Sequence, residues 1–385
     1  MADTPIDVLV VIDSLVPAGA ERSMVQMAPL LIERGVSLGF ALLHDRPGLQ
    51  DELIDQGIDV TVLGGSGRGH WTSGLSALIG HRAPDLVHTV LFEAGLTGRL
   101  AARRRGVPSV STIASEPYSP AHLDNPNLRR WKVRAAQVSE AASLRLTSRV
   151  HAVSEPVARA VASRLRYPSD RIDVVPRGRD PEWLGRRSPE RGSAARAGLG
   201  LEADDLVALT VARHEYVKGL DVLIDAVPLI LAEEPKAVFL LAGRQTKTTA
   251  ELEERARRLG VADRIHFLGE RNDIPELLAA ADAFLLPTRR EGFPGAIVEA
   301  MAMEVPVVAS DIPEVRAVVD ESTAILVPLD DPGALAAGFR QAVIGDATAE
   351  RLAAARQRFE DRLTLEPVAD AMVELYHRAI AVRRR

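Results

Sequence analysis

The sequence contains no cysteine among its 385 residues. Without thiols it can form neither a disulfide framework nor a thiolate zinc site, and it has no cysteine nucleophile. It also has no apolar run that approaches the roughly 20 residues needed to cross a bilayer. The opening residues, MADTP, lack the basic and apolar regions of a signal peptide. We therefore expect a cytoplasmic protein, with a peripheral contact at the inner face of the membrane left open.

Other chemical signatures are absent as well. The sequence has no Asp-x-Asp pair of the kind that holds a metal in sugar-nucleotide sites, and its nine histidines show no HExxH spacing. It has no GxSxG nucleophile elbow. Positive charge is not in excess, because 47 lysines and arginines face 53 acidic residues and the net charge is −6. We therefore expect no bound metal and no nucleic-acid partner.

The sequence does contain a regular alternation of short apolar runs and helical patterns. Apolar runs rich in β-branched residues are typical of parallel strands that are buried on both faces. In the first half these runs lie at residues 6–12, 37–43, 58–63, 86–90, 109–113, 150–153 and 172–175. In the second half they lie at residues 206–211, 237–242, 264–267, 283–286, 305–309 and 324–327.

Helical periodicity falls between these runs. It covers residues 21–33, 49–56, 127–149, 220–232, 250–259, 274–281, 297–303, 333–343, 349–360 and 368–383. Residues 178–205, rich in Gly, Pro, Arg and Asp, read as an interdomain linker. Strands that alternate with helices at this spacing predict βαβ units. We therefore predict an α/β protein with two Rossmann-like, doubly wound domains that face each other across a cleft.

Two segments allow more than one interpretation. The glycine-rich segment 64–69 resembles a phosphate loop but matches neither GxGxxG nor GxxxxGK[ST], and we interpret it as a flexible connection. The expected helix 127–149 carries Arg129, Arg130, Lys132, Arg134 and Arg145. Such a basic helix can rest on anionic lipid, although a solvated outer face explains the same pattern.

The segment around which the chain is organised is RREGFPGAIVEAM, at residues 289–301. It follows a short apolar run and leads into a helical pattern, so Glu291 would lie in a loop and Glu299 inside the following helix. Gly292 and Gly295 would leave backbone N–H groups uncovered near the start of that helix, where an anion is favoured. Two carboxylates and bare amides suit a polyhydroxyl ligand attached to a phosphate. The alternative is a tight turn with two solvated glutamates.

A second charged segment follows the expected strand 206–211. It places Arg213 and Lys218 in one loop, with Gly219 at the entry to the next helix. Because ligands gather at the carboxyl ends of parallel strands, these cations could hold a diphosphate, each bond contributing roughly 1.5–3 kcal/mol. Surface salt bridges are the alternative. In the other half, Gly19 could let the backbone approach the same phosphate, or could simply form a turn.

These motifs resemble those of the retaining GT-B glycosyltransferases of family four, also called glycosyltransferase group 1. The segment AGAER at 18–22 is similar to the family's Gly-Gly-Ala-Glu-Arg loop. VVPRG at 174–178 is similar to its Val-Ile-Pro-Asn-Gly strand end, and residues 311–319 fit the segment that follows the two-glutamate motif. The likeness covers nearly the whole chain.

The charged positions carry the most specific part of the resemblance. Arg213 and the Lys218-Gly219 pair resemble the arginine and lysine with which the family holds the donor diphosphate. Glu291 and Glu299, on either side of Gly-Phe-Pro, resemble the family's two-glutamate motif. By this resemblance Glu291 lies beside the donor sugar and Glu299 accepts hydrogen bonds from the ribose hydroxyls.

The resemblance implies a metal-independent, retaining hexosyltransferase. It would move a sugar from a nucleoside diphosphate sugar to a hydroxyl on a glycan, a lipid-linked molecule or a small molecule, and it would need no cofactor. It also implies an acceptor-binding domain at residues 1–178 and a nucleotide-sugar-binding domain at residues 179–365. A C-terminal helix, 366–385, would cross back to the first domain.

The resemblance also assigns roles to individual residues. The implied catalytic residues are Glu291, Arg213 and Lys218. The implied donor-binding residues are Gly19, Arg213, Lys218, Gly243, Phe293, Pro294, Gly295 and Glu299. We expect acceptor contacts from Arg22, His88 and Ser115. Taken alone, however, His88 suggests a packing or hydrogen-bonding role, as do His44 and His151, because each follows or lies on an expected strand.

The chain departs from the family pattern at three places. Ala114 occupies the position where the family commonly has a histidine that contacts the donor sugar. The usual Gly-x-Gly is reduced to Gly243-Arg244-Gln245, and Arg177 replaces the common asparagine. These changes suggest altered sugar or base recognition. Two alternatives to the transferase stay open: a GT-B sugar-nucleotide epimerase, which needs the same hold on the diphosphate, and a catalytically silent scaffold that keeps the fold. The sequence does not identify the donor sugar, the base, the acceptor or the oligomeric state.

Overall fold

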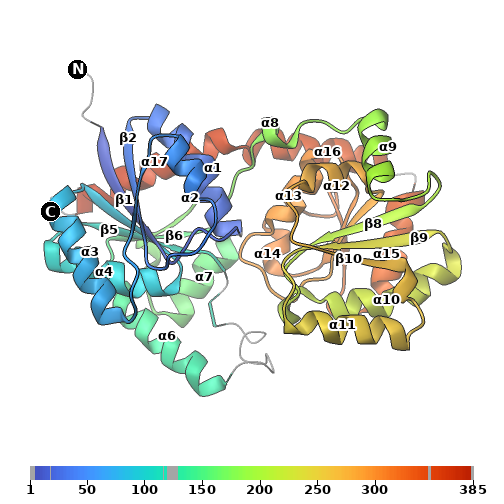
Figure 1. The fold of residues 1–385 in the computed structure, drawn as a ribbon, viewed down its shortest axis with the longest axis horizontal. Helices are drawn as coiled ribbons and strands as arrows, with labels where there is room; N and C mark the ends of the chain where they lie inside the picture. The colour runs from blue at the N-terminus through green and yellow to red at the C-terminus, as the bar shows by residue number, and fades with distance from the viewer. Residues whose placement is uncertain (1–4, 18, 116, 119–128, 346–347, 383–385) are drawn as a thin grey trace. The chain divides into compact units, whose positions relative to one another are not determined.

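The computed structural model describes residues 5–17, 19–115, 117–118, 129–345 and 348–382. The chain divides into two compact units (Figure 1). The first unit comprises Met1–Gly178 together with Leu365–Arg385, and the second comprises Arg179–Thr364. Each unit has one parallel sheet with helices packed on it, which confirms the prediction of two doubly wound α/β domains. No helix within the described ranges is long and apolar enough to cross a membrane.

The first unit contains a seven-stranded sheet in which every pair of neighbours is parallel. The strand order is β3-β2-β1-β4-β5-β6-β7. The strands are β1 (Ile6–Ile12), β2 (Val36–Leu42), β3 (Asp59–Val62), β4 (Leu86–Val90), β5 (Ser109–Ile113), β6 (Arg149–Ala152) and β7 (Ile172–Val174). The helices are α1 (Gly19–Glu33), α2 (Gln50–Asp55), α3 (Arg68–Arg82), α4 (Phe92–Arg105), α6 (Arg130–Leu144), α7 (Glu155–Arg164) and α17 (Leu365–Ala381), with a 3₁₀ turn, η1, at Ser169–Arg171.

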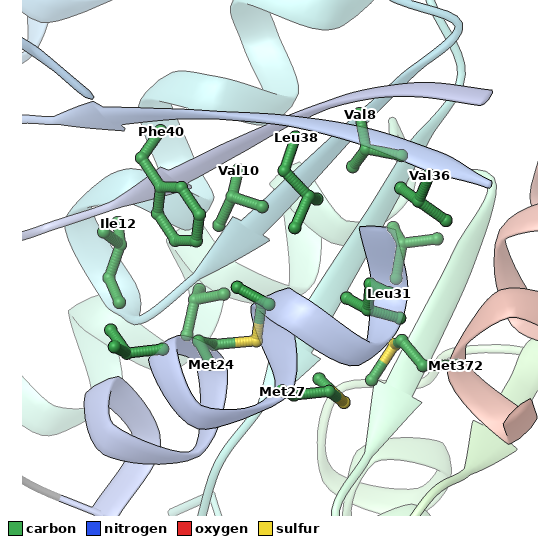
Figure 2. Close-up of a cluster of buried hydrophobic side chains, with 14 of the residues drawn as sticks. Val8, Val10, Ile12, Met24, Met27, Leu31, Val36, Leu38, Phe40 and Met372 are labelled. Atoms are coloured by element: carbon green, nitrogen blue, oxygen red, sulfur yellow. The ribbon is translucent and has the colours of Figure 1, made fainter. Parts of the chain in front are cut away.

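An apolar core fills the space between α1 and the β1–β2 part of this sheet (Figure 2). The parallel register places Val8 opposite Leu38 and Val10 opposite Phe40, so alternate residues of the two strands share one face. The side chains that meet there are Val8, Val10 and Ile12 from β1, Val36, Leu38 and Phe40 from β2, and Met24, Met27 and Leu31 from α1. The helical spacing of the last three gives α1 one continuous apolar face.

The C-terminal helix α17 completes this core although it is distant in sequence. Met372 reaches the same cluster (Figure 2), and Tyr376 is fully buried in it. At the surface, Arg34 at the end of α1 donates to Asp370 at 2.5 Å and also pairs with Glu366. Exposed ion pairs contribute little, so the buried apolar face is what holds α17 on the first unit.

A chain of buried hydrogen bonds runs from α17 across four strands. The Tyr376 hydroxyl is 2.8 Å from His88 Nδ1, and His88 Nε2 is 2.7 Å from Thr112 Oγ1. Thr112 Oγ1 is also 2.8 Å from His151 Nδ1, and His151 Nε2 is 2.8 Å from the carbonyl oxygen of Val175. The chain therefore connects α17 to β4, β5, β6 and the end of β7.

The carbonyl at one end fixes the direction of every bond in this chain. Val175 can only accept, so His151 donates from Nε2 and accepts at Nδ1 from the Thr112 hydroxyl. Thr112 must then accept from His88 Nε2, which leaves His88 Nδ1 to accept from Tyr376. Both histidines are neutral in this arrangement. Burial lowers the pKa of His88 to about 3, with repulsion from His151 adding to the shift, and burial lowers the pKa of His151 to about 4.

The second unit contains a six-stranded sheet, again parallel throughout, with the order β10-β9-β8-β11-β12-β13. The strands are β8 (Leu206–Val211), β9 (Ala237–Ala242), β10 (Ile265–Gly269), β11 (Ala283–Leu286), β12 (Val307–Ser310) and β13 (Ile325–Val327). The helices are α8 (Pro181–Leu184), α9 (Pro189–Gly198), α10 (Leu220–Glu233), α11 (Lys247–Arg258), α12 (Ile274–Ala280), α13 (Gly295–Ala302), α14 (Pro313–Arg316), α15 (Pro332–Ile344) and α16 (Thr348–Arg362). Two 3₁₀ turns, η2 (Tyr216–Lys218) and η3 (Ala262–Arg264), precede α10 and β10.

The prediction of a linker at residues 178–205 was wrong. From Arg179 onward this segment belongs to the second unit and forms α8 and α9. The Pro and polar residues that suggested a linker are helix-start residues: Asp180 and Ser188 cap the two helices by accepting from backbone N–H groups, and each helix begins with proline. Composition alone does not separate a linker from a series of short capped helices.

Other boundaries also differ from the prediction. The basic helix expected at residues 127–149 corresponds to α6, which covers only Arg130–Leu144. It ends earlier than expected because Arg149 already begins β6 and pairs with Val110. Residues 127–128 lie outside the described ranges. The expected connection 64–69 is shorter because α3 begins at Arg68. Helices α3, α4, α7 and α14 were not predicted at all. α4 carries its charges and small residues on several faces and is covered by neighbouring elements, so it lacks a clear amphipathic period.

The two neutral histidines lead to a prediction about pH and stability. In the unfolded chain a histidine titrates near pH 6.5, well above the folded pKa values of about 3 and about 4. As pH falls below about 6.5, only the unfolded chain gains these protons, so the free energy of unfolding falls by about 1.4 kcal/mol per pH unit for each histidine. We expect His88→Gln to reduce this slope by about 1.4 kcal/mol per pH unit between pH 6 and 4.5, measured by urea unfolding.

The matched control for this experiment is Tyr376→Phe. It removes the donor to His88 but keeps both histidines, so it should lower stability by about 1–3 kcal/mol at every pH and leave the slope unchanged. Equal slopes for the wild-type protein and His88→Gln would contradict the assignment.

Candidate active site

The second sheet changes its winding direction between β8 and β11. From β8 the chain proceeds outward through β9 and β10, then crosses to β11 on the other side of β8 and continues outward through β12 and β13. In sheets of this kind ligands bind outside the carboxyl ends of the strands at the point of reversal. The loops that leave β8 and β11 contain Lys218 and Glu291, respectively. The topology therefore brings together two charged segments that are far apart in sequence.

Direct hydrogen bonds fasten the two loops to each other. The backbone N–H of Arg289 donates to the carbonyl oxygen of Val217 at 2.8 Å, and the Thr288 hydroxyl donates to the same oxygen at 3.0 Å. Arg289 Nη1 donates to the carbonyl oxygen of Tyr216 at 2.7 Å, and its guanidinium lies 4.3 Å from the centroid of the Tyr216 ring. The turn before Lys218 thus has a fixed position relative to the loop that carries Glu291.

Arg289 is in turn held by two carboxylates. Its guanidinium bonds both oxygens of Asp221, at 2.9 and 2.7 Å, and donates to Asp330 at 2.6 Å. Burial opposes the charge of Arg289, but the hydrogen bonds to Asp221 and Asp330 outweigh it and raise its pKa. Sequence reasoning assigned no role to Arg289 and missed this one. The signal was a doubled arginine directly before the glutamate motif.

Lys218 and Glu291 form a largely buried ion pair at this edge of the sheet. Lys218 Nζ is 2.6 Å from Glu291 Oε1, and the two side chains are only 16% and 9% exposed. The described residues supply no hydrogen-bond donor to the other carboxylate oxygen, Oε2. A cation and a carboxylate are therefore presented side by side, each with further bonding capacity.

Gly219 is required for this approach. Its φ of 65° lies in the left-handed region, and a Cβ atom added there would lie 1.9 Å from the carbonyl oxygen of Pro287, which follows β11. No side chain fits at that distance. The glycine after Lys218 thus serves the contact between the two loops, which sequence reasoning had interpreted only as an easy entry into the helix.

Glu299 is also buried and paired. It lies on α13, and its Oε1 accepts from Arg179 Nε at 2.6 Å, with side chains only 9% and 5% exposed. The alternative interpretation of the 289–301 segment, a turn with two solvated glutamates, is therefore wrong, because both Glu291 and Glu299 are buried and each bonds one cation. Sequence reasoning missed Arg179 because it lies within the segment interpreted as a linker.

The expectation of a bare amide at Gly295, the first residue of α13, was wrong. The Gly295 N–H is not uncovered, because it donates to the carbonyl oxygen of Phe293 at 2.9 Å. Phe293 and Pro294 are themselves buried. A Cβ atom on Gly295 would lie 1.8 Å from Nη2 of Arg179, so the missing side chain makes room for that guanidinium.

Arg213 is placed less firmly than Lys218. Its side chain is 44% exposed and pairs with Glu215 of the same loop at 2.7 Å, as the salt-bridge alternative proposed. The backbone around it is fixed: a Cβ on Gly243, whose φ is 141°, would lie 2.0 Å from the carbonyl oxygen of Ala212. The adjacent His214 donates its N–H to the Arg244 carbonyl oxygen at 3.0 Å. The loops after β8 and β9 are thus packed tightly against each other, whereas the Arg213 head is partly exposed.

The remaining predicted residues belong to the first unit. Gly19 is the exposed first residue of α1, and a Cβ there would lie 3.1 Å from a guanidinium nitrogen of Arg177. Arg22 is half-buried and Ser115 is exposed. His88 is fully buried and both its ring nitrogens are engaged, so we withdraw it as an acceptor contact.

Two known protein families match the chain, one in each half. Residues 17–183 match the family described as Glycosyltransferase Family 4. Residues 205–345 match the family described as Glycosyl transferases group 1. Among the described residues no group of three or more His, Asp or Glu side chains could hold a metal ion.

Several similar proteins are D-inositol 3-phosphate glycosyltransferases. The D-inositol 3-phosphate glycosyltransferase of Xylanimonas cellulosilytica is 32% identical over 332 residues, which is 82% of this chain and 77% of the relative. The enzyme of the same name from Streptomyces avermitilis is 30% identical over 81% of this chain and 69% of its own length.

Similar solved structures cover nearly the whole chain. Anabaena Alr3699/HepE in complex with UDP and glucose superposes with a TM-score of 0.83 at 25% identity, over 96% of this chain and 98% of that one. Sucrose-phosphate synthase from Thermosynechococcus elongatus has a TM-score of 0.81 at 21% identity, over 97% of this chain and 99% of that one. The second likeness shows the fold alone, and both support two Rossmann-like domains of the GT-B type.

The contact between the two loops predicts unequal costs for two glycine substitutions. Gly260 has a φ of 71°, close to that of Gly219, but a Cβ there would meet nothing within 4 Å. Gly260→Ala should therefore cost only the left-handed backbone strain, about 1–2 kcal/mol of unfolding free energy. Gly219→Ala should cost a further ~1–3 kcal/mol because it pushes against the Pro287 carbonyl. Urea unfolding of both variants measures the difference, and equal costs would mean that the loops are not in close contact.

Proposed function

The chain belongs to glycosyltransferase family 4, and we propose that this glycosyltransferase moves a sugar from a nucleoside diphosphate sugar to a hydroxyl with retention at the anomeric carbon. The observation that carries the proposal is the ion pair between Lys218 and Glu291 at the point of reversal of the second sheet. In the proposed reaction negative charge develops on the departing diphosphate and positive charge develops on the sugar ring. A buried cation beside a buried carboxylate matches this separation of charge.

The donor would bind to the second unit. Lys218 and Arg213 would hold the diphosphate, and the exposed, locally paired head of Arg213 is free to reorient toward it. Gly243 would let the backbone approach the nucleotide, and Phe293, Pro294 and Gly295 would line the start of α13. Because the similar Anabaena protein was solved with UDP and glucose, uridine diphosphate sugars are the first donors to test.

The acceptor would bind to the first unit, near Arg22 and Ser115. Its hydroxyl would attack the anomeric carbon on the face from which the diphosphate leaves, so no protein nucleophile and no metal would be required. Glu291 would bind the donor sugar and stabilise the positive charge on its ring. D-inositol 3-phosphate, named in the relatives' activity, is the first acceptor to test.

The proposal is tested by the configuration of the product. The protein is incubated with a panel of UDP-, GDP- and ADP-sugars and with D-inositol 3-phosphate or simple glycosides as acceptors, and the anomeric proton of the product is observed by NMR. We expect the same anomeric configuration in product and donor. The opposite configuration, or no transfer from any donor, would count against the proposal.

The two glutamates should have unequal roles. Glu291 would act on charge that develops only in the transition state, so Glu291→Gln should lower kcat by about 10²–10³ with donor affinity largely kept. Glu299 would bind the ribose equally in ground and transition states, so Glu299→Gln should mainly raise the KM for the donor. Steady-state kinetics at varied donor concentration separates the two effects.

A matched control is Glu254→Gln, which removes an exposed glutamate paired with Arg257 on α11. It should leave both kcat and KM unchanged. If Glu291→Gln kept full turnover while Glu299→Gln slowed the chemical step, the two roles would be reversed.

A further inference from the structure

Arg179 is a buried cation that the proposed reaction does not use. Its side chain is 5% exposed, and it is the first residue of the second unit. Its backbone is fixed by residues near the end of the same unit: the N–H donates to the carbonyl oxygen of Leu363 at 2.8 Å, and Arg179 forms a parallel bridge with Thr364. The guanidinium therefore extends from a fixed backbone position toward α13.

The guanidinium lies at the junction of two residues already placed in the donor site. Its Nε bonds Oε1 of Glu299 at 2.6 Å, and its Nη2 occupies the space that a side chain at Gly295 would need. Glu299 follows Gly295 by about one helical turn, and side chains on a helix lean toward its N-terminus. Arg179 thus fills the gap between the start of α13 and the carboxylate of Glu299.

The contact leaves one carboxylate oxygen of Glu299 available. Oε1 is bonded to Arg179, and the described residues give Oε2 no hydrogen-bond donor. The Lys218–Glu291 pair has the same arrangement, with one oxygen held at 2.6 Å and the other open. Without the cation, the Glu299 side chain could rotate about its three torsions and its open oxygen would have no fixed direction.

We propose that Arg179 is a positioning residue, which holds one oxygen of Glu299 so that the other accepts hydrogen bonds from the ribose hydroxyls of the donor. The inference rests on the proposed function, because it assumes that a nucleoside diphosphate occupies this site. Arg179 then determines how strongly the protein distinguishes ribose from a sugar without these hydroxyls. A hydrogen bond to a charged group contributes enough to give roughly ten- to hundredfold discrimination.

The test is the ratio of two dissociation constants measured by calorimetry on the full chain. The probes are UDP and 2′,3′-dideoxy-UDP, and the same pairs for GDP and ADP. For the wild-type protein we expect roughly tenfold or stronger preference for the ribonucleotide. For Arg179→Met we expect that preference to fall to within about threefold of unity, while the affinity for the dideoxy probe changes little, as also expected for Glu299→Gln.

Three further variants separate positioning from a general effect on the fold. Arg191→Met removes another arginine of the same unit, which bonds Glu276 at 2.8 and 3.0 Å, and it should leave the ratio unchanged. Arg179→Lys keeps the charge but not the planar guanidinium, and it should keep the fold and give an intermediate ratio. In a Glu299→Gln background, Arg179→Met should change the ratio no further.

The outcomes are distinguishable. If Arg179→Met weakens both probes equally, or if both Arg179 variants keep the wild-type ratio, the positioning role is overturned while donor binding stands. If the wild-type protein binds none of the nucleoside diphosphates, the proposed function fails and the inference fails with it. A selective loss of ribose preference supports the inference.

Discussion

The contact on which the candidate site depends is the ion pair between Lys218 and Glu291. The two residues are brought together because β8 and β11 lie side by side where the second sheet reverses its winding, so their following loops meet. Arg289 then links these loops through both its backbone and its guanidinium. Gly219 lets the loops approach to a distance that no side chain could tolerate. The contact between Lys218 and Glu291 thus depends on three features: the strand order of the second sheet, the buried Arg289 and the absence of a side chain at Gly219.

Burial strengthens the electrostatic interaction between Lys218 and Glu291. Exposed ion pairs are screened by water and contribute little, whereas a charge inside the protein interacts more strongly and is costly to leave without a partner. Glu291 and Glu299 each meet this requirement with one cation at one oxygen, and each keeps the other oxygen available. The site therefore combines fixed charge with open bonding capacity, which a preorganised transferase site needs.

The first unit also buries polar side chains, among them two neutral histidines that are satisfied by hydrogen bonds alone. His88 and His151 lie inside the sheet, and a continuous chain of hydrogen bonds between Tyr376 and Val175 satisfies both ring nitrogens of each. The same chain attaches the C-terminal helix to four strands. His88 therefore stabilises the first unit, and neither of its ring nitrogens remains to bind an acceptor.

The sequence by itself determined the class of fold and most of the strands, because buried parallel strands are local apolar runs that leave a clear pattern. It also identified Glu291, Glu299 and Lys218 as candidate site residues, since their spacing to glycines and strand ends is a local property. It did not reveal α8 and α9, whose capping residues look like those of a linker. Nor did it reveal the partners of the two glutamates. Only the tertiary structure decided that Arg179 holds Glu299, because that pair joins residues 120 positions apart through the fold and leaves no local signal.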